Sequence, residues 1–434
     1  MFKSKEKFLE VVVSLFVLAL SYPSCFAESN LEQLSVSPQP TIIFPKTSLG
    51  PEELAVIVND ADPLSVEIAQ YYKIKRNIPE RNMIHISFKP GSTTMNQAEF
   101  TKIKTQVDLI TPQQVQAFAL TWSKPYRVDC MSITTAFALG FDSKYCANGC
   151  ELTKPNPYFN SPSNTPYKMF KMRPTMSLAG TDFNEVKKLI DRGILSDNTL
   201  PSGTGYLLDT TDKNRNVRAA QYDELLRYMD GIFKLERVKS NFIENKTDVM
   251  FYFTGTSEVA KVTSNTFIPG AIADHLTSAG GQLTDSLQMS ILRWLEAGAS
   301  GSYGAVVEPC NFPGKFPIPG IVINYYINGE TLIEAYWKSV ALPGQGIFVG
   351  EPLAKPYGGY KVELKNGELS ITTRILQPGI YAVFGADSGV GPYKILARGM
   401  PVGIGKQVIK IQNASYLFYR IVRETQKIQR KSMN

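Results

Sequence analysis

The residues with the most useful chemistry lie between positions 248 and 311. An apolar segment, Val249–Phe253, is followed by the polar pair Asp274 and His275, and a second apolar segment ends at Glu308. Carboxylates and an imidazole at neighbouring strand ends could transfer protons or activate a metal-bound water. Because parallel sheets bind ligands beyond the carboxyl ends of their strands, this pattern predicts a site at those ends.

Asp274, His275 and Glu308 are therefore the candidate catalytic residues. His275 could be a general base or a metal ligand, or a satisfied histidine at the end of an element. Glu308 directly precedes a proline, in a position that should be partly desolvated, so its carboxylate needs a donor, a cation or a metal. Arg293 or Lys315 could be a purely structural partner for it. The sequence identifies no particular metal or cofactor.

Five more polar residues follow predicted strands and are candidates for binding a ligand: Asp60, Lys124, Arg127, Thr256 and Asn311. Asp62 is explained as a helix cap, whereas Asp60 has no such role and is free to face the crevice. Lys124 and Arg127 could hold an anionic group or be ordinary rim charges.

The N-terminus predicts export. Three lysines precede the apolar segment Val11–Leu20, and Cys25-Phe26-Ala27 fits a cleavage site. This apolar segment is much shorter than the roughly 20 residues of a spanning helix, and no later segment is long and apolar enough to span a bilayer. We therefore expect cleavage of residues 1–27 after Ala27 and a periplasmic or extracellular mature protein.

Four cysteines remain after cleavage: Cys130, Cys146, Cys150 and Cys310. In an oxidising compartment an even number favours disulfides, and four cysteines allow three pairings between which the sequence does not choose. Asn148-Gly149 can turn tightly enough to join Cys146 to Cys150. A four-thiolate zinc site is the alternative, although the spacing does not match paired C-x2-C knuckles.

The formal net charge is +7, and much of the excess lies near the C-terminus. We interpret residues 423–434 as a solvated basic tail, with contact to an anionic surface polymer as the alternative. No basic stripe interleaved with aromatic residues is present, so nucleic acid is not an expected partner. The oligomeric state cannot be inferred.

Apolar strand-like segments alternate with helical ones between residues 51 and 357, which predicts a three-layer α/β sandwich with a mostly parallel sheet. Leu54–Val58, a helix capped by Asp62 and the strand Met83–Phe88 form the first βαβ unit. Other predicted helices include 219–232 and 286–297, the latter capped by Asp285 with Leu287 pointing inward.

Three regions depart from this alternation. Residues 28–50 are predicted to be an extended leader, and residues 141–174 a long excursion pinned by the Cys146–Cys150 loop. Residues 360–422 contain short alternating segments separated by turns such as Pro378-Gly379, which predicts a small immunoglobulin-like β-sandwich.

The chain resembles an exported bacterial family of unknown function over residues 54–357. The segments that carry this resemblance are Ser65–Pro79, Leu120–Val128, Pro269–Gly281, Trp294–Pro317 and Glu334–Pro352. The resemblance implies no particular activity.

Two short motifs are similar to the gingipain branch of the caspase-like cysteine peptidases. Tyr252-Phe253-Thr254-Gly255-Thr256 looks like a strand that ends in a Thr-Gly-His turn, and Gly350-Glu351-Pro352-Leu353 looks like a Gly-Asp-Pro motif near the end of the catalytic domain. The resemblance implies a parallel α/β sheet followed by an immunoglobulin-like domain.

The peptidase dyad does not follow from this resemblance. Such enzymes need an imidazole beside a thiol, but Thr256 stands at the histidine position and no cysteine lies between Thr254 and Gly304. Cys310 and His275 could still form an unconventional pair. We therefore expect a binding or assembly protein on a caspase-like scaffold at the cell envelope, with a surface polymer or envelope protein as partner. A hydrolase that uses Asp274, His275 and Glu308, with or without a metal, is the alternative.

Overall fold

The computed structural model describes residues 39–147 and 150–424. The predicted signal peptide, the first part of the predicted leader and most of the predicted basic tail lie outside these residues. No helix in the described ranges has the length and apolarity to cross a membrane.

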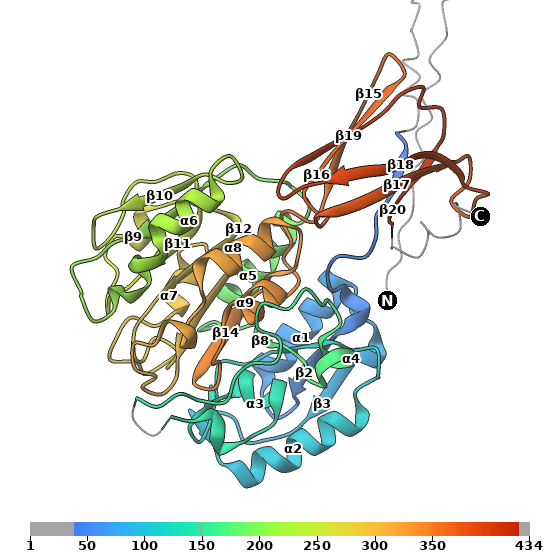
Figure 1. The fold of residues 1–434 in the computed structure, drawn as a ribbon. Coiled ribbons are helices and arrows are strands. Elements are labelled where there is room, and N and C mark those ends of the chain that lie inside the picture. The colour runs from blue at the N-terminus through green and yellow to red at the C-terminus, as the bar shows by residue number, and fades with distance from the viewer. Residues whose placement is uncertain (1–38, 148–149, 425–434) are drawn as a thin grey trace, which may run out of the picture. The chain divides into compact units, whose positions relative to one another are not determined.

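A large, mostly parallel ten-stranded sheet forms the centre of the α/β domain (Figure 1). Its strand order is β10-β9-β11-β12-β13-β14-β8-β5-β2-β3, and β13 and β14 pair antiparallel. The strands are β2 (Leu54–Asn59), β3 (Met83–Ile86), β5 (Ala117–Leu120), β8 (Thr175–Ser177), β9 (Thr204–Leu208), β10 (Leu235–Val238), β11 (Val249–Thr254), β12 (Phe267–His275), β13 (Gly301–Ala305) and β14 (Gly346–Gly350).

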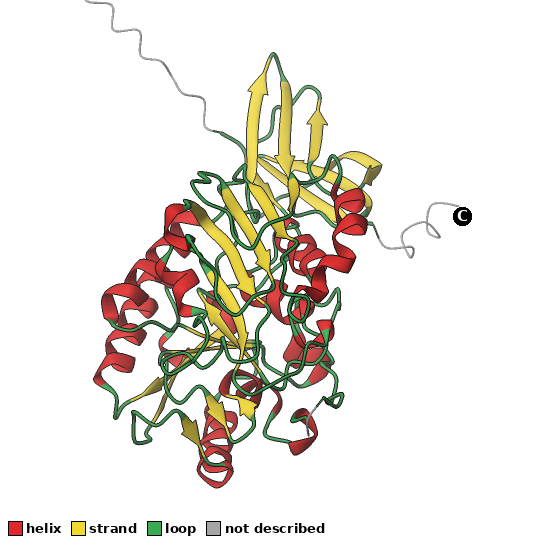
Figure 2. Cartoon of the chain, turned by 90° about the vertical axis from the view of Figure 1, so that its left-hand side faces the viewer, coloured by secondary structure: helices red, strands yellow, loops and turns green. Residues whose placement is uncertain are grey.

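Helices cover both faces of this sheet, as Figure 2 shows. One apolar core lies beneath α1 (Pro63–Arg76), α5 (Phe183–Ser196), α6 (Tyr222–Met229), α8 (Pro319–Ile327) and α9 (Leu332–Ser339). The other lies beneath α2 (Gln97–Ile110), α3 (Ile133–Leu139) and α7 (Leu292–Glu296). Burial on both faces explains why strands such as β2 and β11 are apolar throughout. The predicted α/β class with a mostly parallel sheet is confirmed.

Two predicted helices are shorter in the structure. Residues 216–221 form a 3-10 turn before α6, and the predicted helix 286–297 contains only α7, so that Leu287 is fully exposed. Serine side chains explain the second difference: Ser286 Oγ donates to the carbonyl of Ala279, and Ser290 Oγ to that of Leu283. Such side-chain bonds offer the backbone an alternative to the helix. Asp285, the predicted cap, instead accepts a hydrogen bond from Tyr126 Oη at 2.8 Å.

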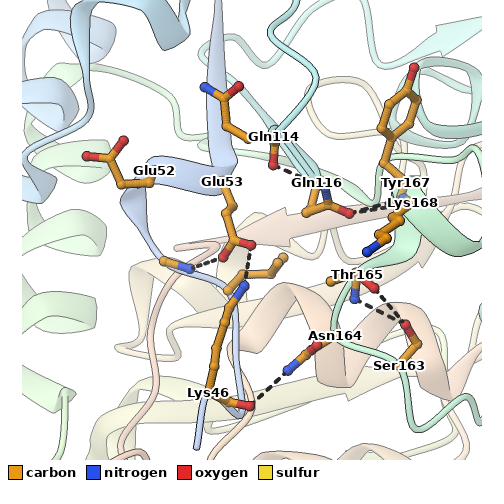
Figure 3. Close-up of polar contacts among 12 residues, drawn as sticks. Lys46, Glu52, Glu53, Gln114, Gln116, Ser163, Asn164, Thr165, Tyr167 and Lys168 are labelled. Atoms are coloured by element: carbon orange, nitrogen blue, oxygen red, sulfur yellow. Dashed lines mark hydrogen bonds and ion pairs between the residues drawn. The ribbon is translucent and has the colours of Figure 1, made fainter.

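The excursion at residues 141–174 is held against the α/β domain by hydrogen bonds. It contains the short helix α4 (Pro166–Phe170), and nearby a three-stranded sheet is formed by β4 (Thr94–Met95), β6 (Arg127–Val128) and β7 (Met131–Ser132). Figure 3 shows two of its anchors: Gln116 Oε1 accepts from the amide nitrogens of Tyr167 and Lys168, and Asn164 Nδ2 donates to the carbonyl of Lys46.

Residues 360–423 form two small sheets that share an apolar core. Strands β15 (Tyr360–Lys365), β16 (Glu368–Thr373) and β19 (Gln407–Ile411) form one sheet, all antiparallel. The other has the order β1-β20-β17-β18, in which β17 (Gly379–Ala386), β18 (Lys394–Val402) and β20 (Phe418–Arg423) are joined by β1 (Thr41–Ile43) from the start of the described chain. We call this unit the β-domain; its immunoglobulin-like topology stays a prediction.

The described end of the predicted leader is not a free extended segment. Thr41–Ile43 forms β1, which pairs parallel with β20, and Leu49 is buried with its amide donating to Glu334 Oε2 at 3.0 Å. Thr-Ile-Ile is a short β-branched segment, a composition that favours a strand once a partner edge is available.

A buried ion pair joins the first helix of the α/β domain to the end of β14. Arg76 of α1 donates from Nε to Glu351 Oε1 at 2.9 Å and from Nη2 to Glu351 Oε2 at 2.5 Å, and Glu351 is fully buried. Tyr72 Oη also donates to Glu351, at 2.6 Å, and Asp197 pairs with the remaining arm of Arg76. Glu351 belongs to the motif that looks like Gly-Asp-Pro, and here its role is structural.

We predict that Arg76→Met lowers the free energy of unfolding by about 3–5 kcal/mol, because it leaves the Glu351 carboxylate buried without its cation. Urea unfolding followed by circular dichroism measures this. The matched control is Lys188→Met, whose partner Glu185 lies at 2.9 Å in an exposed pair, and whose cost should stay below about 1 kcal/mol. Equal costs for the two variants would show that the buried pair is not important for stability.

Candidate functional site

A cleft of about 300 Å³ lies just beyond the carboxyl ends of β12 and β13. We call it the strand-end cleft. Its lining residues are Cys150, Asn214, Arg215, Leu276, Thr277, Ser278, Glu308, Pro309, Cys310, Asn311 and Phe316. Like the predicted site, it lies beyond the carboxyl ends of strands, and whether it binds a ligand stays a prediction. Its volume lies at the small end of the range for ligand sites in proteins.

Arg215 is held on one wall of the cleft by two contacts. Its Nε donates to Thr277 Oγ1 at 3.1 Å, and its Nη1 lies 2.9 Å from Asp212 Oδ2. Thr277 is itself fixed, because its hydroxyl donates to Gln288 Oε1 at 2.7 Å. Among the described residues, Arg215 Nη2 has no hydrogen-bond partner. One edge of a positioned guanidinium is therefore available to an anionic group.

Glu308 contributes a carboxylate to the same cleft. Its side chain is exposed, and Oε1 accepts a hydrogen bond from the Cys310 amide at 2.8 Å. The expected desolvation of Glu308 is wrong, because this residue lies at a surface loop beyond β13. Neither expected partner pairs with it: Arg293 pairs with Glu296, and Lys315 Nζ donates to Gln345 Oε1 at 3.2 Å.

A disulfide forms part of the wall of the cleft. Cys150 is bonded to Cys310, and Cys130 to Cys146, with Cα–Cα distances of 5.4 Å and 5.7 Å. The expected loop closed by Cys146 and Cys150 is therefore wrong, as is the four-thiolate zinc alternative. Each of the two neighbouring cysteines instead reaches a distant partner, and this holds the excursion against the strand-end loops.

His275 ends β12 but does not face the cleft. Its ring is buried between two partners: Trp294 Nε1 donates to Nδ1 at 2.9 Å, and Nε2 donates to the carbonyl of Met289 at 3.0 Å. Burial lowers the pKa of His275 to about 4, and the hydrogen bond to Met289 opposes this only in part. The ring is therefore neutral at physiological pH, with both nitrogens occupied.

Asp274 points to the opposite face of the sheet, because successive residues of a strand alternate in direction. Its Oδ1 accepts from Arg218 Nη1 at 2.5 Å, and Arg218 Nη2 donates to the carbonyl of Thr254 at 2.6 Å. Both side chains are buried. Burial raises the pKa of Asp274 to about 6, although Arg218 opposes the shift.

The structure therefore does not bring Asp274, His275 and Glu308 together. Asp274 and His275 lie in separate cores on the two faces of the sheet, and Glu308 lies at the surface. Among the described residues, no group of three or more His, Cys, Asp and Glu side chains is arranged to hold a metal ion.

Of the five ligand-binding candidates, only Asn311 lines the strand-end cleft. Its Nδ2 donates to the carbonyl of Asn214 at 3.0 Å. Asp60 contacts His85 Nδ1 at 2.7 Å at the end of β2, which lies five strand positions from β12 and hence about 24 Å away. The expectation that Asp60 shares a crevice with His275 and Glu308 is wrong.

The other three candidates have local roles. Arg127 Nε donates to Thr94 Oγ1 at 2.7 Å, Thr256 Oγ1 donates to the carbonyl of Glu258 at 3.0 Å, and Lys124 is half-buried beyond β5. Sequence reasoning missed Arg215 and Thr277, which line the cleft. Arg215 follows Asp212 three residues later in a polar loop, a common pattern that marks no site by itself.

Two solved structures are similar to the chain at low sequence identity. No protein-family model and no curated protein matches the chain. A solved structure described as a protease is 11% identical, covers 87% of this chain and 98% of its own, and has a TM-score of 0.42. The complex of the pro- and mature domains of RgpB from Porphyromonas gingivalis is 9% identical, covers 86% and 99%, and has a TM-score of 0.40. Scores below 0.5 carry no argument about activity.

We predict that His275→Gln lowers the free energy of unfolding by an amount that depends on pH. A folded-state pKa near 4, below the usual 6.5, means that His275 contributes stability above pH 6.5, which is lost as the pH falls through 4. The cost of His275→Gln should therefore be about 3 kcal/mol smaller at pH 4 than at pH 7. Urea unfolding of both proteins at each pH measures it, and because both carry Asp274, its opposite pH dependence cancels. A cost that does not change with pH would contradict the buried neutral ring.

We also predict that peptide mapping of the unreduced protein finds the linkages Cys130–Cys146 and Cys150–Cys310. The same digest after reduction is the control, in which both linked peptides should disappear. A peptide that links Cys146 to Cys150 would contradict the described wall of the cleft.

Proposed function

We propose that the protein is an exported binding protein that holds a small zwitterionic ligand, such as a short peptide, in the strand-end cleft. The observation that carries this proposal is the pairing of opposite charges in one small cavity. Arg215 offers a free guanidinium edge and Glu308 a carboxylate oxygen without an ion-pair partner among the described residues, and both line the same 300 Å³. A ligand with one carboxylate and one ammonium group complements both.

The neighbouring side chains would supply orientation. The hydroxyl of Ser278 and the side chain of Asn311 line the cleft, and Phe316 and Leu276 add apolar surface. The cleft thus combines polar side chains that can orient a ligand with apolar surface that can contact it, as sites that bind small molecules do.

Binding is favoured over peptide hydrolysis because the cleft lacks an activated nucleophile. Cys310 is consumed by its bond to Cys150, and both ring nitrogens of His275 are occupied in the interior. Ser278 and Thr277 carry hydroxyls, but a hydroxyl needs an adjacent base to attack a carbonyl group. The separation of Asp274, His275 and Glu308 likewise removes the support for the alternative hydrolase.

Export is part of this proposal. The two disulfides are compatible with an oxidising compartment, where such bonds persist. The immunoglobulin-like character of the β-domain and its role in assembly at the envelope belong to the proposal as well. The caspase-like scaffold without a dyad is supported by the sheet and by the placement of the cysteines and histidines.

The experiment is thermal unfolding of the mature chain with glycylglycine and other dipeptides as probes. A probe that binds the folded state at about 100 times its dissociation constant should stabilise it by about 2.7 kcal/mol. Glu308→Gln should weaken this binding at least tenfold, because the ammonium group loses its counter-charge. Glu258→Gln is the matched control, since Glu258 is exposed on the loop after β11 and does not line the cleft.

Three results would contradict the proposal. The first is equal weakening by Glu258→Gln, and the second is a complete lack of stabilisation by any zwitterionic probe. The third is hydrolysis of casein by the purified protein that Cys310→Ser abolishes, which would restore the unconventional cysteine pair.

A further inference from the structure

The four-stranded sheet of the β-domain is apolar on both faces. Side chains on its inner face, such as Val383 and Ile421, belong to the core shared with the three-stranded sheet. Its outer face is mostly apolar as well, with Arg420 among the apolar residues, whereas the second face of such a sheet normally meets water and is polar. We call this outer face the apolar sheet face: Ile43, Ile380, Phe384, Ile395, Phe418 and Val422.

The strand register defines this face. Phe384 of β17 is paired with Ile395 of β18 on one side and with Arg420 of β20 on the other. Paired residues in neighbouring strands point to the same side. Ile395 is 51% exposed, Ile380 41% and Val422 37%, so none of these three is covered in the structure.

The three-stranded sheet provides an internal comparison. Its outer residues are polar and carry both charge signs, with Lys365 paired to Glu363 and Lys410 to Glu368. The contrast shows that an apolar outer face is a property of one sheet and not of the whole β-domain.

Charge distinguishes the two sheets as well. The four strands β1, β17, β18 and β20 contain Lys394, Arg398, Arg420 and Arg423 and no acidic residue. Residues 360–424 contain nine Lys and Arg against four Asp and Glu, a net charge of +5 out of +7 for the chain. The surface thus combines exposed apolar side chains with an uncompensated positive charge.

The combination of exposed apolar side chains and positive charge limits which kind of surface can cover the apolar sheet face. A second copy of the same face would bring together two β-domains whose residues 360–424 each carry a net charge of +5, which is unfavourable. An anionic membrane surface matches both properties, since it attracts Lys and Arg and accepts apolar side chains at the boundary between headgroups and acyl chains.

We propose that the apolar sheet face docks the protein on the surface of a membrane that contains anionic lipids. Ile380, Ile395 and Val422 enter the headgroup region, and Arg420, which the register places on the same face, contacts a lipid phosphate. Val390, which is 95% exposed on the loop between β17 and β18, adds to the inserted surface. Its neighbour Gly389 lies against Phe418, a member of the face.

The test is co-sedimentation of the mature chain, residues 28–434, with lipid vesicles. We expect binding to vesicles of phosphatidylcholine mixed with phosphatidylglycerol, much weaker binding to phosphatidylcholine alone, and release at high salt. Ile395→Glu should weaken binding at least tenfold, because it places a carboxylate on the face. The matched control is Val408→Glu, which changes a residue 54% exposed on the polar face of the other sheet and should bind like the unchanged protein.

A second pair of variants tests the charge. Arg420→Gln should weaken binding, because Arg420 is paired with Phe384 on the apolar sheet face, whereas Lys361→Gln, on the three-stranded sheet, should not. Circular dichroism checks that all variants fold.

Several results would overturn the proposal. Absence of binding to the anionic vesicles would do so, as would equal binding to both vesicle types or equal losses in the two members of either variant pair. A dimer seen in sedimentation velocity and abolished by Ile395→Glu would identify a second copy as the occupant. Vesicle binding only after removal of residues 28–38 would identify that segment as the occupant. The ligand test in the strand-end cleft is independent of all these outcomes.

Discussion

The requirement that buried polar groups be paired decides what the edge of the central sheet can do. Asp274 and His275 lie at the end of β12, where a parallel sheet normally presents its functional residues. Both are buried, however, and an unpaired charge or imidazole there would be costly. Arg218 pairs with Oδ1 of Asp274, and Trp294 and Met289 occupy both ring nitrogens of His275. These groups therefore stabilise the core, and only residues one loop further out remain free to meet a ligand.

The strand-end cleft is consequently built from loops and not from strand residues. Arg215 comes from the loop after β9, Thr277 from the loop after β12, and Glu308 from the loop after β13. The Cys150–Cys310 disulfide adds the long excursion as a fourth element, across a sequence separation of 160 residues. A covalent bond of this kind limits how far the loops can separate, so the cleft is partly preorganised for a ligand.

The β-domain shows a different relation between burial and side-chain type. Its two sheets share one core, yet their outer faces differ: one carries paired charges, the other carries apolar side chains with only cations among them. The outer face of the three-stranded sheet is well solvated by water, whereas the apolar sheet face is stabilised by contact with another surface. The strand-end cleft and the apolar sheet face thus offer separate sites with different chemistry.

The sequence alone determined the α/β class and the first βαβ unit, and it predicts a site beyond the strand ends. Each depends on local patterns: apolar segments of strand length, Asp62 capping α1 through a hydrogen bond to the Leu64 amide, and polar residues directly after β11, β12 and β13. Two helices were not predicted correctly, for different reasons. The helix predicted at 286–297 was shortened by serine bonds to backbone groups, and α8 was missed because no periodic pattern marks it.

Only the tertiary structure decided the site residues and the disulfide pairing. Nothing near His275 in the sequence indicates that Trp294 will cap its ring, and nothing near Cys310 indicates that Cys150 will reach it. Likewise, Glu308 seemed partly buried and Asp60 seemed close to it, because spacing along the chain says nothing about the order of strands in a sheet. Local patterns reflect interactions between neighbours in sequence, whereas burial and partnership depend on which distant segments pack together.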